Sequence, residues 1–183
     1  MANIYDKLYK DTAYGDIKAS IGLTLVNDAI ISVPKFNTVL DVGCGPGYSV
    51  LEFLKQGKYA NGIETSKYLV EEKLKLLTDS DITRYGSILE IPCAADSFDL
   101  VFCTEVLEHI EEKDVITAIS ELVRVSKKYL YLTICFVDSV IDKDLHLTVQ
   151  PAGWWDDIFK QFSIKKIKKN VNPTGGIYVF KKT

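Results

Sequence analysis

The 183-residue sequence predicts an α/β fold built on a doubly wound, mainly parallel sheet of seven strands. Over most of the chain, short apolar runs alternate with segments of helical periodicity, which is typical of a parallel sheet covered by helices. One of the apolar runs leads directly into a glycine-rich turn. The last two runs are joined by a short turn, which predicts an antiparallel hairpin at the C-terminal edge of the sheet.

The seven strands are predicted at residues 38–42, 59–65, 82–87, 98–103, 129–136, 163–170 and 176–182. Helices are predicted within residues 1–15 and 16–33, at 48–54, 67–78 and 117–125, and from Pro151 onward, because proline suits the first turn of a helix. The segment VNPTG between the last two strands is a turn sequence. We therefore expect one domain, 1–183, with a helical segment at 1–34 and an α/β core at 38–183.

The glycine-rich turn belongs to residues 38–48, which read TVLDVGCGPGY. Glycine at three alternate positions lets the chain reverse tightly and lets a ligand approach the backbone closely. The dinucleotide fingerprint would require its third glycine where Tyr48 stands, which argues against a nicotinamide cofactor. A phosphate-binding loop would require a lysine followed by serine or threonine, and the turn has neither. The turn thus predicts a nucleotide-like ligand of another kind.

The D-V-G-C-G-P-G pattern resembles motif I of the class I S-adenosylmethionine-dependent methyltransferases. The resemblance covers roughly residues 38–183 and is strongest over 38–109. It implies a Rossmann-like fold and S-adenosyl-L-methionine as the cofactor. Independently, Glu64 ends the second strand at about the distance from the glycines where nucleotide-binding units place a carboxylate on ribose hydroxyls. An alternative for Glu64 is a solvated acid at the end of a strand.

Further matches to the family pattern follow the third strand, at Gly86, Pro92, Phe98 and Asp99. Ser87 stands where the family usually has an acid, so its hydroxyl or the backbone would meet the adenine amino group, with Ile88 against the ring. The cofactor contacts that the resemblance and the spacing together imply are Asp41, Gly43, Cys44, Gly45, Gly47, Glu64, Thr65, Ser87, Ile88, Thr104 and Glu105.

His109 is the candidate catalytic residue, because an imidazole can accept a proton from the methyl acceptor near neutral pH. The L-E-H-I sequence around it is common in the resembled family, so a role in the pocket wall or at a helix start is the alternative. Glu105 and Glu108 are assigned structural roles. In the family, helices before the sheet often fold over the cofactor, so one of the tyrosines at 5, 9 and 14 is a candidate for closing the site.

The candidate acceptor contacts are Tyr14, His146, Trp154 and Trp155. The segment DLHLTVQPAGWW is similar to a stretch in methyltransferases associated with surface-polysaccharide biosynthesis, which suggests a sugar or glycan hydroxyl or amine as acceptor. Adjacent residues on a helix cannot both face one way, so at least one tryptophan is expected to pack against the sheet.

Composition limits the partners. The net charge of −3 and the pI near 5.5 give no general attraction to nucleic acid or to anionic membranes. The one basic run, KKIKK at 165–169, is more typical of a protected sheet edge than of a phosphate site. The four cysteines are scattered without metal-ligand spacing, so we expect reduced thiols, no metal site and a cytoplasmic protein. The oligomeric state stays open.

Two hypotheses about function follow. The first is methyl transfer from S-adenosylmethionine to a small-molecule acceptor, because the chain offers little material for a macromolecular groove. The second is a cofactor-binding regulatory or assembly protein without transferase activity, motivated by the small size and the lack of a decisive catalytic residue.

Overall fold

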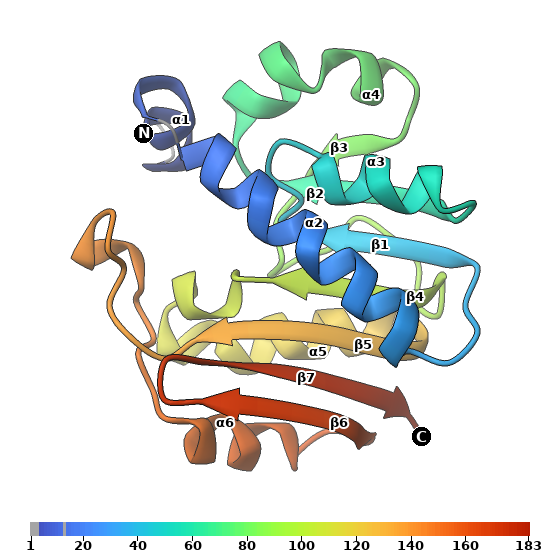
Figure 1. Ribbon diagram of the computed structural model, residues 1–183, viewed down its shortest axis with the longest axis vertical. Helices are drawn as coiled ribbons and strands as arrows, with labels where there is room; N and C mark the ends of the chain where they lie inside the picture. The colour runs from blue at the N-terminus through green and yellow to red at the C-terminus, as the bar shows by residue number, and fades with distance from the viewer. Residues whose placement is uncertain (1–3, 13) are drawn as a thin grey trace. The chain divides into compact units, whose positions relative to one another are not determined.

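The computed structural model describes residues 4–12 and 14–183, with the backbone alone at 15–22 and 143. The chain falls into two compact units, Met1–Ser87 and Ile88–Thr183, which we take in turn. Figure 1 labels the helices and strands of both units.

The first unit contains three parallel strands in the order β3-β2-β1 and four α-helices. Two helices precede the first strand, as the periodicity predicts, and the glycine turn separates β1 from α3. The elements are α1 (Ile4–Asp11), α2 (Tyr14–Ser32), β1 (Thr38–Val42), α3 (Tyr48–Lys55), β2 (Tyr59–Glu64), α4 (Lys75–Asp79) and β3 (Thr83–Tyr85).

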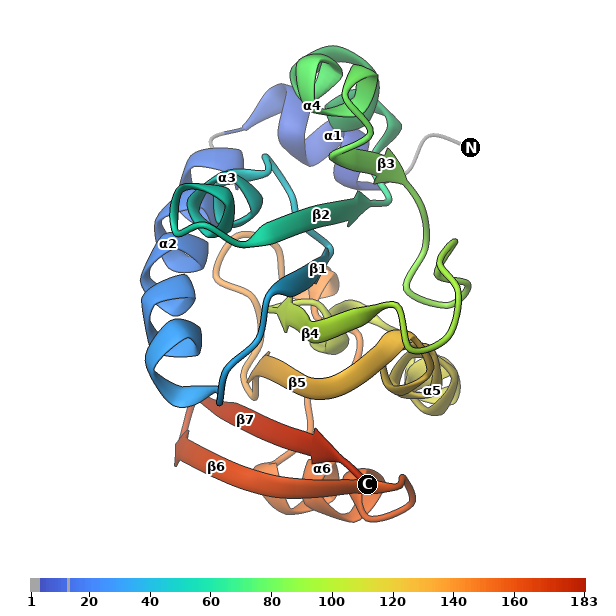
Figure 2. The same cartoon turned by 90° about the vertical axis from the view of Figure 1, so that its right-hand side faces the viewer.

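Strand β1 and helix α3 form the core of the first unit. The last four residues of β1 are buried, as expected for a strand covered on both faces. Helix α3 buries Val50 and Phe53, and Phe53 packs edge-on against Phe36 at 6.3 Å between ring centroids. Helix α2 packs beside α3, which can be followed in Figures 1 and 2. This packing holds the start of α3, and with it the glycine turn, in place.

The single helix predicted at 67–78 is wrong. A π-helical turn at Leu69–Lys73 comes first, with the Leu74 amide donating to the Leu69 carbonyl at 2.7 Å, and α4 follows it. Leu69, Val70 and Leu74, in and directly after this turn, are all buried.

The second unit contains four strands in the order β4-β5-β7-β6 and two α-helices. Strands β4 and β5 are parallel, whereas β7 runs antiparallel to both of its neighbours, so the predicted C-terminal hairpin is confirmed. Short 3₁₀ turns occur at Leu107–His109, Glu112–Asp114 and Lys143–Leu145. The other elements are β4 (Phe98–Thr104), α5 (Val115–Val125), β5 (Ser126–Cys135), α6 (Ala152–Phe159), β6 (Ile164–Asn172) and β7 (Gly175–Lys182).

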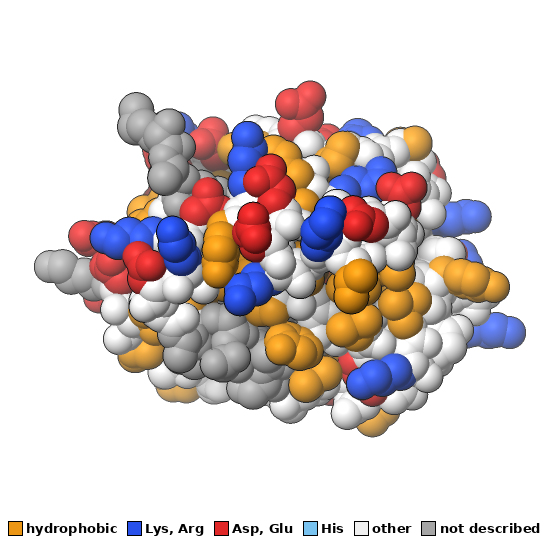
Figure 3. Space-filling view, turned by 90° about the horizontal axis from the view of Figure 1, so that it is seen from above, with side chains coloured by type: hydrophobic (Ala, Val, Ile, Leu, Met, Phe, Trp, Pro, Cys, Tyr) orange, Lys and Arg blue, Asp and Glu red, His pale blue; other side chains and the backbone are white. Residues whose placement is uncertain are grey.

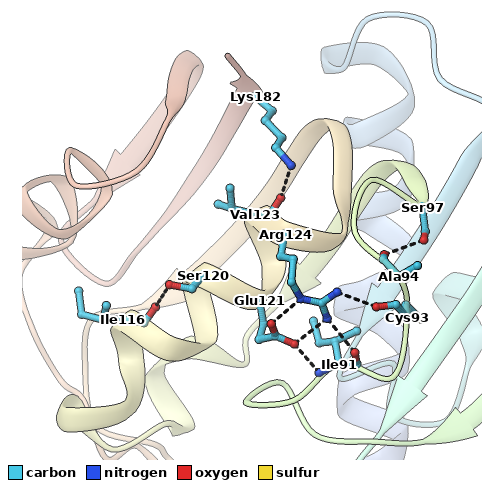
Figure 4. A network of polar contacts seen from close by, with 10 residues as sticks. All are labelled: Ile91, Cys93, Ala94, Ser97, Ile116, Ser120, Glu121, Val123, Arg124 and Lys182. Carbon is cyan, nitrogen blue, oxygen red and sulfur yellow. Dashed lines mark hydrogen bonds and ion pairs between the residues drawn. The ribbon is translucent and has the colours of Figure 1, made fainter.

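Arg124 on α5 fixes the segment that leads into β4 (Figure 4). Its guanidinium donates to the carbonyls of Cys93 and Ile91 at 2.7 and 2.9 Å and to both carboxylate oxygens of Glu121. The Ile91 amide in turn donates to Glu121 at 2.7 Å. The hydrogen bonds from Arg124 hold the pKa of Glu121 below its ordinary value. The planar fork of arginine thus satisfies a stretch of backbone that has no ladder of its own.

An aromatic cluster joins α6 to β7. Phe159 lies 5.2 Å from Tyr178 and 4.7 Å from Phe180 between ring centroids, and the ring of Trp155 lies 6.4 Å from that of Phe159 in a tilted arrangement. Proline 151 takes the N-cap position of α6. These contacts bury the C-terminal half of the helix against the hairpin.

The basic run lies on β6, the last strand in the order, so its placement on a sheet edge is confirmed. Two of its lysines, Lys166 and Lys169, bind the carboxylate of Asp156 on α6. Burial would raise the pKa of Asp156, but the hydrogen bonds from these lysines lower it. Part of the positive charge is therefore neutralised within the chain. Acidic and basic side chains are likewise interspersed over the face shown in Figure 3.

Two composition-based expectations can be compared with the structure. The four cysteines are thiols rather than disulfides, with Cys44 and Cys103 buried and Cys93 and Cys135 half-buried. Among the described residues, no helix has the length and apolar character needed to cross a bilayer.

Candidate functional site

The glycine turn of the first unit requires glycine for its backbone conformation. Gly43, Gly45 and Gly47 have φ values of 77°, 51° and 79°, a left-handed region that other residues rarely adopt. A Cβ atom at Gly47 would also lie 3.0 Å from Leu74 Cδ2. The turn predicted as a ligand loop is therefore a loop of special geometry, placed where β1 ends.

The loop uses its own N–H groups internally. The amides of Gly43 and Cys44 both donate to the Ile63 carbonyl, at 2.9 and 3.0 Å, and the Gly47 amide donates to the Cys44 carbonyl at 3.0 Å. The Gly45 amide donates to Glu64 Oε2 at 2.8 Å. A phosphate-binding loop directs such donors at its ligand. This loop instead directs them at the end of β2, so it is built for a ligand other than a pyrophosphate.

Glu64 braces the loop. Its side chain is only 4% exposed, and its second oxygen, Oε1, accepts from the Ser66 amide at 2.8 Å. The contact of this carboxylate with ribose hydroxyls stays a prediction. What sequence spacing did not predict is that the same carboxylate shapes the glycine loop.

Asp41 is a second buried carboxyl group, at 3% exposure. Burial, and then the charge of Glu64, raise its pKa from 3.8 to about 8, so Asp41 is protonated at neutral pH. Burial together with these two carboxyl groups also raises the pKa of the Cys44 thiol. Asp41 and Glu64 are therefore two acidic groups next to a loop whose amide hydrogens already have acceptors. This arrangement favours a ligand with hydroxyl or cationic groups and disfavours an anion.

Gly62 on β2 supports the loop from below, and sequence analysis missed it. A Cβ atom there would lie 2.7 Å from Cys44 Sγ and 3.0 Å from Val50 Cγ2. The signal available was a glycine inside a strand, which often marks the close approach of other groups. Cys44, predicted as a cofactor contact, is buried in this packing.

Of the N-terminal tyrosines, Tyr9 is the one that reaches the loop. Its hydroxyl lies 3.0 Å from the position that a Cβ atom at Gly45 would take, and burial followed by the charge of Glu64 raises its pKa. Tyr14 packs against Tyr9 at 5.1 Å between ring centroids and is buried. Because Tyr14 is only 4% exposed, its predicted contact with an acceptor would require its surroundings to move, and the contact stays a prediction.

Asp6 attaches α1 to the segment that follows Glu64, and sequence analysis missed this residue as well. Its Oδ1 accepts from the Ser66 hydroxyl at 2.7 Å and from the Tyr68 amide at 3.0 Å. Helix α1 is thus tied to the segment that follows Glu64. Thr65 and Ser87, both predicted cofactor contacts in this unit, are half-buried after β2 and β3.

The remaining predicted cofactor contacts belong to the second unit. Ile88 is buried, and Thr104 and Glu105 are half-buried at the end of β4. Glu105 has a left-handed φ of 54°, and its amide donates to the backbone oxygen and to Oγ1 of Thr133, both at 3.1 Å. The Thr133 hydroxyl donates back to Glu105 Oε1 at 2.8 Å. Because three hydrogen bonds fix it, this strained residue holds a defined position after the strand.

The second unit brings together His109 and His146, which sequence analysis treated separately as a base and an acceptor contact. Their ring centroids lie 4.8 Å apart in an edge-on arrangement. Glu108 is next to them, fully buried, with Oε1 accepting from the Cys135 amide at 3.2 Å. The nearest ligand-type atoms of these three residues all lie within 4.8 Å of one another.

The two adjacent tryptophans differ, as helix geometry predicts. Trp155 is 0% exposed and belongs to the aromatic cluster with Phe159, as expected for the tryptophan that packs against the sheet, and its predicted contact with an acceptor stays untested. Trp154 is half-buried and stays a candidate. Trp155 shares the buried face of α6 with Phe159, four residues on, which explains why it is the inward ring.

Comparison with known proteins bears on this description. Residues 40–133 match a family model described as a methyltransferase domain. An uncharacterized methyltransferase of Schizosaccharomyces pombe is 30% identical over 157 residues, covering 79% of this chain and 54% of the relative. A ubiquinone biosynthesis O-methyltransferase of Vibrio campbellii is 29% identical over 128 residues, covering 64% and 54%. The chain spans about half the length of these curated relatives.

Solved structures share the fold at low sequence identity. A chain from the complex between the Haloferax volcanii Trm112 methyltransferase activator and the putative methyltransferase matches with a TM-score of 0.78 at 14% identity, covering 99% of this chain and 98% of that one. The magnesium protoporphyrin IX methyltransferase of Synechocystis, solved with bound SAH, matches with a TM-score of 0.63 at 18% identity, covering 93% and 84%. Together with the family match, which includes the glycine turn, Glu64 and His109, these comparisons show that the chain belongs to the S-adenosylmethionine-dependent methyltransferase family.

Proposed function

We propose that this chain binds S-adenosyl-L-methionine through the glycine loop of its first unit and transfers the methyl group to a small molecule. The observation that carries the proposal is the internal use of the loop amides, with the Gly45 amide held by the Glu64 carboxylate at 2.8 Å. S-adenosylmethionine has no phosphate, so it requires no free amides of this kind, whereas a dinucleotide does.

The residues present fit this cofactor. A carboxylate such as that of Glu64 is the type of group that accepts hydrogen bonds from ribose hydroxyls. A cationic ligand next to Glu64 and Asp41 would be favoured electrostatically and would lower the pKa of Asp41. When bound, the cofactor supplies a methyl group on a sulfonium, which a positioned nucleophile displaces in line. The task of the chain is then mainly to orient the reactants.

For the acceptor, we propose a small molecule with a hydroxyl group, and a sugar or glycan hydroxyl is the first class to test. The support comes from Trp154 and His146, both half-buried in the second unit, and from the O-methyltransferase name of one relative.

The test is turnover with methyl-labelled S-adenosylmethionine and a panel of sugars, phenols and amines, in which transfer of label to a hydroxyl compound is expected. Label that appears on protein or nucleic acid alone would contradict a small-molecule acceptor. In parallel, calorimetry should detect binding of S-adenosylmethionine and none of NAD⁺. Tighter binding of NAD⁺ would overturn the assignment of the loop.

A second candidate is a cofactor-binding partner subunit without transferase activity. Its motivation is that the sequence offers no decisive catalytic residue for methyl transfer. This hypothesis predicts cofactor binding without turnover on any acceptor, and activity that appears in a second protein only when this chain is added. Labelled product from the isolated chain would exclude it.

A further inference from the structure

The cluster of Glu108, His109 and His146 in the second unit combines the two histidines of the whole sequence with a fully buried carboxylate. The nearest ligand-type atoms of the three residues lie within 4.8 Å of one another. Imidazole nitrogen and carboxylate oxygen are the ligands that Zn²⁺ and its first-row neighbours accept in three-ligand protein sites. His109 and His146 are separated in sequence by 36 intervening positions, so the fold, and not local spacing, assembles the cluster.

Both imidazole rings are oriented through their Nδ1 atoms. His109 Nδ1 lies 2.9 Å from the Leu145 carbonyl oxygen, and His146 Nδ1 lies 2.6 Å from the Val137 carbonyl oxygen. A carbonyl oxygen can only accept, so Nδ1 carries the proton in both rings and Nε2 of each neutral ring carries a lone pair. Metal-binding histidines in proteins are oriented in this way, with one nitrogen donating to a backbone carbonyl and the other binding the ion.

The backbone around the cluster is pinned on both sides of His146. The amides of Leu147 and Thr148 both donate to the Glu108 carbonyl, at 2.8 and 3.0 Å, and the Thr148 hydroxyl donates to the Ile110 carbonyl at 2.6 Å. On the other side of His146, the Leu145 carbonyl is the partner of His109. The segment that carries His146 is therefore attached directly to the turn that carries Glu108 and His109.

From this geometry we propose that Glu108, His109 and His146 form a binding site for one borderline divalent transition-metal ion, with Zn²⁺ as the first choice. Ligand atoms about 2.0–2.2 Å from a tetrahedral ion lie about 3.3–3.6 Å from one another, so atoms that are up to 4.8 Å apart must close by up to about 1.5 Å on binding. His146 is half-buried, next to a surface loop, and can make this movement by side-chain rotation.

Three protein ligands leave a fourth position of the ion open for water or for another oxygen donor. An ion there would also assign His109 a different role from the one predicted from sequence, because an Nε2 atom that binds metal cannot accept a proton. A hydroxyl compound bound at the open position would become more acidic, because the ion stabilises the oxyanion. The metal site itself does not depend on the proposed methyl transfer.

The experiment titrates Co²⁺, as a spectroscopic probe, and then Zn²⁺ into the full chain after chelator treatment, followed by visible absorption and by calorimetry. We expect one ion per chain, with d–d bands and without the near-ultraviolet band of a cobalt–thiolate bond. His146→Ala and Glu108→Gln should each weaken binding at least about tenfold, the lower end of the loss seen when even a supporting partner is removed. Glu111→Gln is the matched control, since its exposed side chain lies in the same segment and pairs with Lys113.

Circular dichroism and thermal unfolding without metal show whether each variant is folded, and His146→Ala carries the decision because its side chain is half-buried. A dissociation constant weaker than about 1 mM for wild type, or binding unchanged in folded His146→Ala, would overturn the proposal. A cobalt–thiolate band that disappears in Cys135→Ser would overturn it too, because the ion would then be bound elsewhere. None of these readouts depends on methyl transfer, so failure here and failure of the proposed function are distinguishable.

Discussion

Glu64→Gln tests the arrangement of acids below the glycine loop. The two oxygens of Glu64 accept from two backbone amides, Gly45 and Ser66, each at 2.8 Å. Glutamine offers one oxygen and one NH₂ group, so one of these buried amides loses its acceptor. An unsatisfied buried donor costs about 1–3 kcal/mol of stability. The substitution also removes the charge that helps to raise the pKa of Asp41.

The lost hydrogen bond destabilises the folded protein, whereas a lower pKa of Asp41 stabilises it at high pH. Measurements at two pH values therefore separate the two effects. Burial and the charge of Glu64 raise the pKa of Asp41 from 3.8 to about 8. The folded protein therefore keeps a proton that the unfolded chain loses, and the free energy of unfolding falls as the pH rises from about 4 to about 8. In Glu64→Gln the pKa of Asp41 is lower, so this fall is smaller. Each pH unit by which that pKa drops recovers about 1.4 kcal/mol above pH 8.

Urea unfolding at pH 6 and pH 9 measures how much the substitution lowers the free energy of unfolding at each pH. We expect Glu64→Gln to cost about 1–3 kcal/mol at pH 6, where Asp41 is protonated, and clearly less at pH 9. Asp41→Asn is the control background, in which the cost should be equal at both pH values. A cost in the wild-type background that is equal at both pH values, or larger at pH 9, would refute the coupling of the two acids.

Three further substitutions test the packing. Gly62→Ala places a methyl group 2.7 Å from Cys44 Sγ and should lower the free energy of unfolding, measured with denaturant, by about 1–3 kcal/mol. The loss should be smaller in a Cys44→Ala background. An equal loss in both backgrounds would contradict the contact. Trp155→Ala should lower the free energy of unfolding by about 3–5 kcal/mol. Trp155→Phe should lower it much less, because the buried indole N–H has no hydrogen-bond partner among the described residues. Similar losses in the two variants would show that this N–H is satisfied. Asn172→Ala removes the acceptor for Thr174 and Gly175 in the hairpin turn and should cost about 1 kcal/mol, while Asn172→Asp keeps it; a neutral Asn172→Ala would contradict the role of the turn.

The strands could be predicted because runs of apolar residues in the sequence indicate which segments are buried. The first strand, Thr38–Val42, has the predicted boundaries, since apolar residues on both faces and a glycine at its end define it. The π-helical turn Leu69–Lys73 could not be predicted from a pattern that averages over α-helical spacing. It depends on the burial of Leu74, which only the tertiary structure shows.

The candidate site was predicted in parts. Spacing identified the glycines and Glu64, but the hydrogen bond from Gly45 to Glu64 depends on the register of β1 and β2. The proximity of His109 and His146 was not predictable, because it is created by the path of the loop after β5. For the same reason, sequence patterns could not tell that Tyr14 is buried whereas Tyr9 reaches the loop.

We have proposed that the glycine loop and its carboxylate bind S-adenosylmethionine. The most direct test of this claim is to measure the affinity of wild type and of Gly45→Val for S-adenosylhomocysteine by calorimetric titration. At Gly45 the φ of 51° strains any other residue, and the nearest atom to an added Cβ is the flexible end of Tyr9, at 3.0 Å. The variant is therefore expected to fold, with a cooperative unfolding transition as the control. Binding with one site in wild type and none in folded Gly45→Val is the predicted result. Equal binding by both proteins, or no binding by wild type at high micromolar concentration, would contradict the claim.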